Sequence, residues 1–198
     1  MKFVTVNGIN THGEHNIDLL GARLSEGGHK VHDFDYPKMT WRDVYSRGLQ
    51  FDVAQKLFDE TEDGDHVVGH SFGCLVIWRC MEMGRRFGGC VLIGAAMNRD
   101  FKPPRGGANR IYAICNPMDR AVSLSRLLCA HDFGQAGTVG FDYEHISKDP
   151  EIHNRYIPHR VKGTHNHSTF FTEAEVLEEI ATICVAEARA AIYTERLD

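Results

Sequence analysis

The sequence has no run rich in lysine and arginine and no long apolar stretch. Its 198 residues carry 22 Lys and Arg against 27 Asp and Glu, a formal net charge of −5. This charge gives no reason to expect nucleic acid or an anionic membrane surface as a partner. A transmembrane helix needs about 18 or more consecutive apolar residues, which are absent. Residues 1–8 are too soon interrupted for a signal peptide, so we expect no membrane span and a cytoplasmic protein.

Paired cysteines of the C-x-x-C type are also missing. The sequence has six cysteines, most of them in apolar runs: Cys74, Cys80, Cys90, Cys115, Cys129 and Cys184. Isolated cysteines in such runs are typical of buried, reduced thiols in a cytoplasmic protein. Repeats, linkers and low-complexity segments are absent as well. The length therefore predicts a single domain, 1–198, with a full hydrophobic core.

Strand-like and helix-like apolar patterns alternate along the whole chain. The predicted strands are residues 2–6, 29–36, 65–69, 89–95, 110–115 and 155–161. The predicted helices are residues 14–26, 43–60, 72–85, 122–130 and 172–194, the last with Thr172 as its N-cap. This alternation predicts an α/β fold, a three-layer α/β/α sandwich with a mainly parallel sheet of about six strands. The glycine-rich residues 133–141 are predicted to form a mobile or tightly turned surface loop.

The central motif of the sequence is Gly69-His70-Ser71-Phe72-Gly73, which joins a strand-like run to a helix-like run. It predicts a strand, a very tight turn and a helix, with the hydroxyl of Ser71 projecting above the sheet edge. The chain at Gly69 and Gly73 must pass so close to its neighbours that a Cβ would clash. Because a helix begins directly after Ser71, its free N–H groups point to where negative charge would develop.

This pentapeptide matches G-x-S-x-G, and in its G-H-S-x-G form the chain resembles the α/β-hydrolase superfamily. The resemblance implies a compact α/β-hydrolase fold without the first two strands of larger members and without a large lid domain. It also implies a serine hydrolase in which Ser71 is the nucleophile. The acid and the histidine should follow in that order, each after a strand end.

The acid implied by the resemblance is Asp119. It follows a strand-like run and a turn at Asn116-Pro117, and it looks like the family's G-x-x-D-x-x-V turn with asparagine in place of the glycine. The alternative is that Asp119 only caps the next helix. Asp132 and Asp142 are rival acids, but they lie in a predicted loop and follow no strand.

Two histidines, His165 and His167, stand between the last predicted strand and the closing helix. His167 lies in His-Ser-x-Phe-Phe close to that helix, so we expect it to be the base. His165 is the alternative base. His70 is expected to pack within the elbow, with its side chain pointing away from Ser71.

The oxyanion hole should consist of two backbone N–H groups. By resemblance these belong to Phe72, directly after the nucleophile, and to Ile9 in the loop after the first strand. The family often has H-G-x in that loop, where this sequence has Asn7-Gly8-Ile9. A backbone donor survives this difference, but the way in which the loop is braced stays open.

Two other chemistries compete for these residues. His165 and His167 form an H-x-H pair near His153 and His159, which a zinc site could use. The triad already accounts for the pair, so we expect no metal and no cofactor. Cys74 is an alternative nucleophile, but it lies inside the predicted helix and should be buried.

The expected activity is hydrolysis of carboxylic esters or thioesters of small to medium acyl groups through an acyl-enzyme intermediate. The expected partner is thus a small-molecule substrate, and the oligomeric state stays open. Several aromatic residues in or near loops either pack in the core or wall an acyl pocket: Trp41, Tyr45, Phe101, Phe133, Phe141 and Tyr143. The alternatives are a hydrolase-fold binding protein or receptor, and an amidase or acyltransferase that uses the same triad.

Overall fold

A computed structural model describes residues 1–9, 17–119, 122, 132–142, 151–157, 167 and 169–195. The strands are β1 (Lys2–Val6), β2 (Lys30–Phe34), β3 (His66–His70), β4 (Phe87–Ile93), β5 (Ala108–Cys115) and β6 (Glu151–Tyr156). The helices are α1 (Ile17–Glu26), α2 (Trp41–Val44), α3 (Arg47–Glu60), α4 (Phe72–Glu82), α6 (Ala136–Val139), α7 (Thr169–Thr172) and α8 (Ala174–Glu195).

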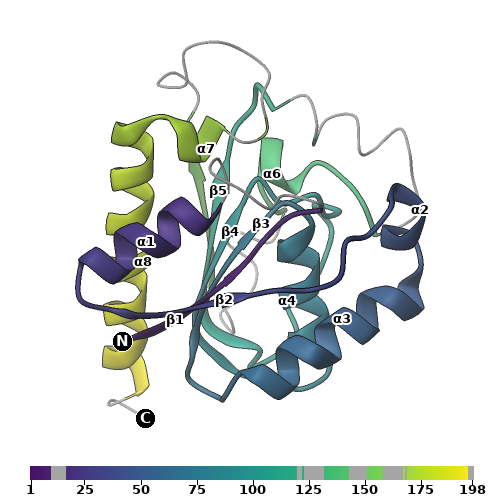
Figure 1. Cartoon of the computed structure of the whole chain (residues 1–198), viewed down its shortest axis with the longest axis horizontal. Helices are drawn as coiled ribbons and strands as arrows, with labels where there is room; N and C mark the ends of the chain where they lie inside the picture. Colours follow the sequence, from purple (N-terminus) through teal and green to yellow (C-terminus); the bar gives the residue numbers. More distant parts are fainter. Residues whose placement is uncertain are drawn as a thin grey trace.

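The described strands form one sheet in the order β2-β1-β3-β4-β5-β6, and each neighbouring pair is parallel. Helices α1 and α8 cover one face, and α3 and α4 cover the other (Figure 1). Strands β3 and β4 are buried at every position, which explains why their sequences lack the polar alternation of a one-sided strand. The predicted three-layer sandwich with a mainly parallel sheet of about six strands is confirmed.

The predicted helix over residues 43–60 is two helices, α2 and α3. Thr40 caps α2, because its hydroxyl accepts a hydrogen bond from the Asp43 backbone N–H and the Asp43 carboxylate accepts one from the Thr40 N–H. Ser46 caps α3 by accepting from the Leu49 N–H. Two N-capping side chains six positions apart thus begin two separate helices.

The predictions for the C-terminal half need correction. The last strand is β6, Glu151–Tyr156, and not residues 155–161. It ends before Pro158, which has no N–H to donate to a ladder. The closing helix is interrupted at Glu173, so Thr172 ends α7 and is not the N-cap of a single long helix. Apart from Val122, the predicted helix over residues 122–130 lies outside the described residues.

Residues 133–141 are not a surface loop. They contain α6, and both Phe133 and Phe141 are buried. Phe141 stacks on Trp78 of α4, and Phe133 meets the ring of Tyr45 edge to face. Burying these aromatic rings against α4 and the α2–α3 connection outweighs the glycine-rich composition that suggested a loop.

Among the described helices, none has both the length and the apolar composition that crossing a bilayer requires.

Candidate active site

Ser71 stands at the apex of a very tight turn between β3 and α4. Its backbone φ is 56°, and among the described residues it is the one non-glycine residue with positive φ. A Cβ added at Gly73 would lie 2.2 Å from the carbonyl oxygen of Val6, and one at Gly69 would lie 2.6 Å from Cδ1 of Ile77. The tight passages predicted at both glycines are therefore present. A strained backbone of this kind costs about 1–3 kcal/mol and is found mainly at functional sites.

Neighbouring segments hold the strained turn in place. The Ser71 N–H donates to the Ile93 carbonyl over 3.0 Å, and the Ala96 N–H donates to the Ser71 carbonyl over 3.4 Å. On another side, a Cβ added at Gly8 would lie 3.0 Å from Cβ of Ser71. The loop after β1 and the turn after β4 thus both adjoin the serine, which keeps 9% of its surface exposed.

His167 and Asp119 form a close pair although 48 positions separate them in the sequence. Nδ1 of His167 lies 2.5 Å from Oδ2 of Asp119, whose side chain is completely buried. The other carboxylate oxygen, Oδ1, accepts the Val122 backbone N–H over 3.1 Å. Asp119 therefore both caps the following segment and binds the histidine. Because an ionised carboxylate only accepts, we assign the ring proton to Nδ1, which leaves Nε2 as the acceptor.

Gly94 connects this pair to the serine turn. It directly follows β4, between the Ile93 and Ala96 groups that bind the backbone of Ser71. A Cβ added at Gly94 would lie 3.2 Å from Cε1 of His167 and 3.5 Å from Oδ2 of Asp119. The serine turn and the His–Asp pair therefore lie at the same carboxyl edge of the sheet. Gly94 was not anticipated from the sequence, because its neighbours come from distant segments.

The loop after β1 is braced by two side chains. Nδ2 of Asn7 donates to Oδ1 of Asp18 over 2.9 Å. The hydroxyl of Tyr36, which follows β2, lies 2.9 Å from the carbonyl oxygen of Asn7 and 2.8 Å from that of Gly8. Tyr36 was not identified from the sequence as a residue of the site. The feature that could have indicated it is its position after β2, which neighbours β1 in the sheet. Of the two proposed oxyanion donors, Ile9 lies in this loop and Phe72 is the first residue of α4.

His70 is completely buried and lies against His167. Its Nε2 lies 3.2 Å from the carbonyl oxygen of His167, and the two imidazole centroids are 4.5 Å apart. Burial, reinforced by the nearby His167, lowers the pKa of His70 well below its usual value. His70 is thus neutral, and Nε2–H is the donor to the His167 carbonyl.

The rival acids and the rival nucleophile have other partners. Asp132 forms an ion pair of 2.9 Å with Arg79, and Asp142 forms one with Arg99 that lowers the pKa of the carboxyl. Cys74 is fully buried, as predicted, and burial raises the pKa of its thiol well above the usual range. A thiol with a raised pKa is a poor nucleophile near neutral pH.

The other histidines considered as zinc ligands or as the base lie partly within and partly outside the described residues. Nε2 of His153, in β6, lies 3.1 Å from Nη2 of Arg110 in β5. His159 and the alternative base His165 lie outside the described residues. Within the described residues, no three side chains of the metal-ligating types come together.

No protein-family model matches the sequence, and no curated protein resembles it significantly. Solved structures do share its fold. The ydeN gene product from B. subtilis is 15% identical with a TM-score of 0.57, over 93% of this chain and 98% of that one. A monoacylglycerol lipase from Paleococcus ferrophilus is 14% identical with a TM-score of 0.57, over 94% of each chain. Together with the strand order and the serine turn, these likenesses identify the fold as that of the α/β-hydrolases.

Proposed function

We propose that this protein is a serine hydrolase that cleaves carboxylic esters or thioesters of small to medium acyl groups. The observation that carries the proposal is the 2.5 Å pair of His167 and Asp119 at the sheet edge that also holds Ser71 on its strained turn. A serine hydroxyl needs a base, and the base needs an orienting acid. The proposal extends to one domain over residues 1–198 and to a cytoplasmic location.

In the proposed mechanism, Oγ of Ser71 attacks the substrate carbonyl while Nε2 of His167 takes its proton. Asp119 keeps the other ring proton on Nδ1 and stabilises the imidazolium that forms. The protonated His167 then gives its proton to the leaving alcohol or thiol. Water, deprotonated by the same imidazole, attacks the acyl-enzyme and releases the acid. The buried Asp119 suits this role because its second oxygen is already satisfied by the Val122 N–H.

The oxyanion would be held by the backbone N–H groups of Ile9 and Phe72. Phe72 is the first residue of α4, whose leading N–H groups have no carbonyl partner within the helix. The bracing of the Asn7–Gly8 segment by Tyr36 supports a fixed position for the Ile9 donor. Losing one such donor typically costs about 3 kcal/mol of transition-state stabilisation.

A fluorophosphonate probe tests the proposal directly. We expect the wild-type protein to be labelled and to hydrolyse p-nitrophenyl esters, and Ser71→Ala to lose both properties. Ser46→Ala is the matched control, since Ser46 is an exposed helix-capping serine whose loss should leave labelling intact. Hydrolysis that is unchanged in Ser71→Ala would refute the serine mechanism. Tight ligand retention without turnover would favour a binding protein, and cleavage of amides alone would favour an amidase.

A further inference from the structure

A pocket opens between α3 and the connection that follows β2. Its volume is about 460 Å³, within the range of small-molecule sites. The apolar part of its lining is Tyr36, Pro37, Met39, Leu49 and Val53. The charged part is Lys38, Asp43, Asp52 and Lys56. We refer to these nine residues as the α3 pocket.

The α3 pocket lies at the same edge of the sheet as the serine turn. Strand β2 neighbours β1, and β1 neighbours β3, which leads into Ser71. Two interstrand spacings correspond to about 10 Å across the sheet. Because all these strands are parallel, their carboxyl ends face one edge. The pocket and the nucleophile are therefore at the same edge of the sheet, and β1 lies between the two strands that lead to them.

Tyr36 links the α3 pocket to the loop beside the serine. Tyr36 is one of the residues that line the pocket, and its hydroxyl contacts the carbonyl oxygens of Asn7 and Gly8. Gly8 in turn lies against Ser71. One buried side chain thus forms both the pocket wall and the support of the loop that the proposed oxyanion hole uses.

The exposed side chain of Leu49 favours binding of an apolar group in the pocket. It is 39% exposed, and it is the one exposed large hydrophobic residue of the described chain that lines either of the two main pockets. Beneath it, Met39 and Val53 are buried and complete an apolar wall. An apolar group seated here would remove the Leu49 side chain from water, which is favourable in proportion to the area covered.

The charges around the pocket favour an uncharged occupant. Two lysines and two aspartates line it, so their formal charges cancel. Two of the four are also occupied, since Nζ of Lys56 donates to the Asp35 carbonyl and the Asp43 carboxylate caps α2. The lining offers no excess charge to bind an ionic tail.

We propose that the α3 pocket receives the uncharged apolar acyl chain of the substrate whose carbonyl lies at Ser71. This inference rests on the proposed serine-hydrolase function and specifies its substrate class. It implies a preference for medium-chain over acetyl esters, because an acetyl group has no chain to place against the apolar lining of the pocket.

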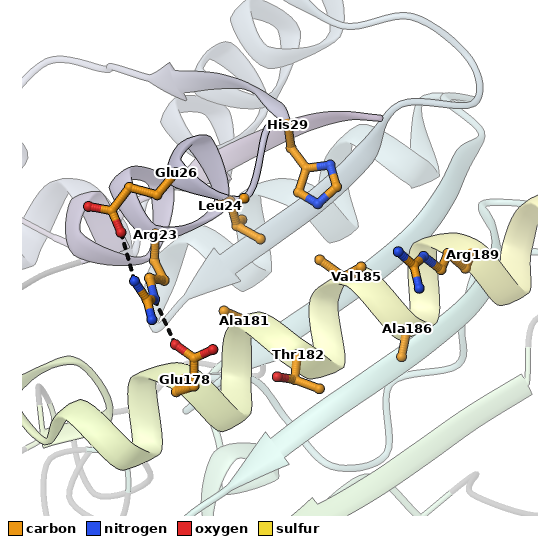
Figure 2. A pocket seen from close by; sticks show the side chains of 11 residues that line it. Arg23, Leu24, Glu26, His29, Glu178, Ala181, Thr182, Val185, Ala186 and Arg189 are labelled. Atoms are coloured by element: carbon orange, nitrogen blue, oxygen red, sulfur yellow. Dashed lines mark hydrogen bonds and ion pairs between the residues drawn. The ribbon is translucent and has the colours of Figure 1, made fainter.

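The test compares p-nitrophenyl octanoate with p-nitrophenyl acetate. Leu49→Trp fills the pocket, and Leu49→Asp places a charge at its mouth. We expect each variant to lower the ratio of kcat/KM for octanoate to kcat/KM for acetate by about tenfold or more. Val185→Trp is the control, since Val185 lines a groove of about 480 Å³ between α1 and α8, on the face of the sheet that α3 does not cover (Figure 2). That variant should leave the ratio unchanged.

The outcomes separate the pocket from the catalytic proposal. If the wild type is labelled at Ser71 and cleaves acetate, but the octanoate-to-acetate ratio is unchanged in both Leu49 variants, the pocket assignment is overturned and the hydrolase proposal stands. An equal loss on both esters overturns the assignment in the same way, because it indicates an effect passed through Tyr36. If the wild type is neither labelled nor active, the proposed function fails and the assignment with it. Thermal unfolding verifies that each variant is folded.

Discussion

The imidazoles of His70 and His167 lie 4.5 Å apart, and Nε2 of His70 is 3.2 Å from the carbonyl oxygen of His167. His70 precedes the nucleophile, whereas His167 precedes the closing helices, so this contact joins two segments 97 positions apart. The burial that keeps His70 neutral also allows an imidazolium to form at His167 without a second charge beside it. His70 is in this sense a positioning residue for the proposed base.

Replacing His70 should lower turnover more than substrate binding. His70→Phe keeps a ring of similar size in the buried site but removes the donor to the His167 carbonyl. A lost hydrogen bond of about 1 kcal/mol corresponds to a roughly fivefold fall in kcat, with KM little changed. His70→Gln, which restores an N–H donor, should recover part of the loss. Steady-state kinetics on one ester measures both, and an unchanged kcat in His70→Phe would contradict the positioning role.

Stability should fall as the pH drops below about 6.5. The folded state lowers the pKa of His70, so below that pH the unfolded chain binds a proton that the folded chain refuses, and stability is lost at up to about 1.4 kcal/mol per pH unit. His29, whose pKa is lowered by burial and nearby cations, acts in the same direction. Urea unfolding at pH 7.5 and pH 5.5 should show a smaller difference in His70→Phe than in the wild type. The same pH dependence of stability in both proteins would show that groups other than His70 cause it.

Asp119→Asn should nearly abolish hydrolysis while the protein stays folded. The amide can hold Nδ1 of His167 in the wrong tautomer, and replacing the orienting aspartate of a triad by asparagine lowers kcat by about 10⁴-fold. Asp142→Asn is the matched control, because Asp142 is an exposed carboxylate paired with Arg99. Its activity should stay within about twofold of wild type, as surface substitutions usually do. A larger loss in the Asp142 variant would reinstate it as the acid.

Gly94→Ala should damage the site as well as the fold. At φ +53° the new methyl group would lie 3.1 Å from Phe170 and 3.2 Å from His167. Gly28→Ala is matched for backbone strain, since Gly28 has φ +80° but no atom within 4 Å of an added Cβ. Both variants should lose about 1 kcal/mol of stability from the strained backbone. Only Gly94→Ala should also lower kcat/KM. Equal kcat/KM in the two variants would show that Gly94 is not needed for the geometry of the site.

Tyr36→Phe should slow catalysis for every acyl length alike. The variant keeps the aromatic wall of the α3 pocket but removes the hydroxyl that contacts the Asn7 and Gly8 carbonyls, at a cost of about 1 kcal/mol in stability. We expect kcat to fall for acetate and octanoate by similar factors, because the oxyanion loop loosens. Tyr112→Phe, a partly exposed tyrosine of β5, should be neutral. A fall in kcat confined to the octanoate ester would show that the Tyr36 hydroxyl helps to bind the acyl chain and does not brace the loop.

Most of the fold could be predicted from local patterns in the sequence. Five strands were predicted within a few residues of β1 to β5, because short runs with apolar residues, bounded by turn residues, are typical of strands. The strand β6 was misplaced, since its sequence, Glu-Ile-His-Asn-Arg-Tyr, is mostly polar, and within residues 152–156 only Ile152 is buried. Its pairing with β5 outweighs its weak intrinsic pattern.

The serine turn could be predicted because the tight bend requires glycine at fixed positions beside Ser71, and such a requirement is visible in the amino-acid letters themselves. What the sequence determined alone is therefore the strand–turn–helix motif and the alternating α/β architecture. Only the tertiary structure decided that His167 meets Asp119, that Tyr36 braces the loop after β1, and that Gly94 must leave room for the pair. These contacts join segments dozens of residues apart, and their partners are set by the order of strands in the sheet, which no local pattern encodes.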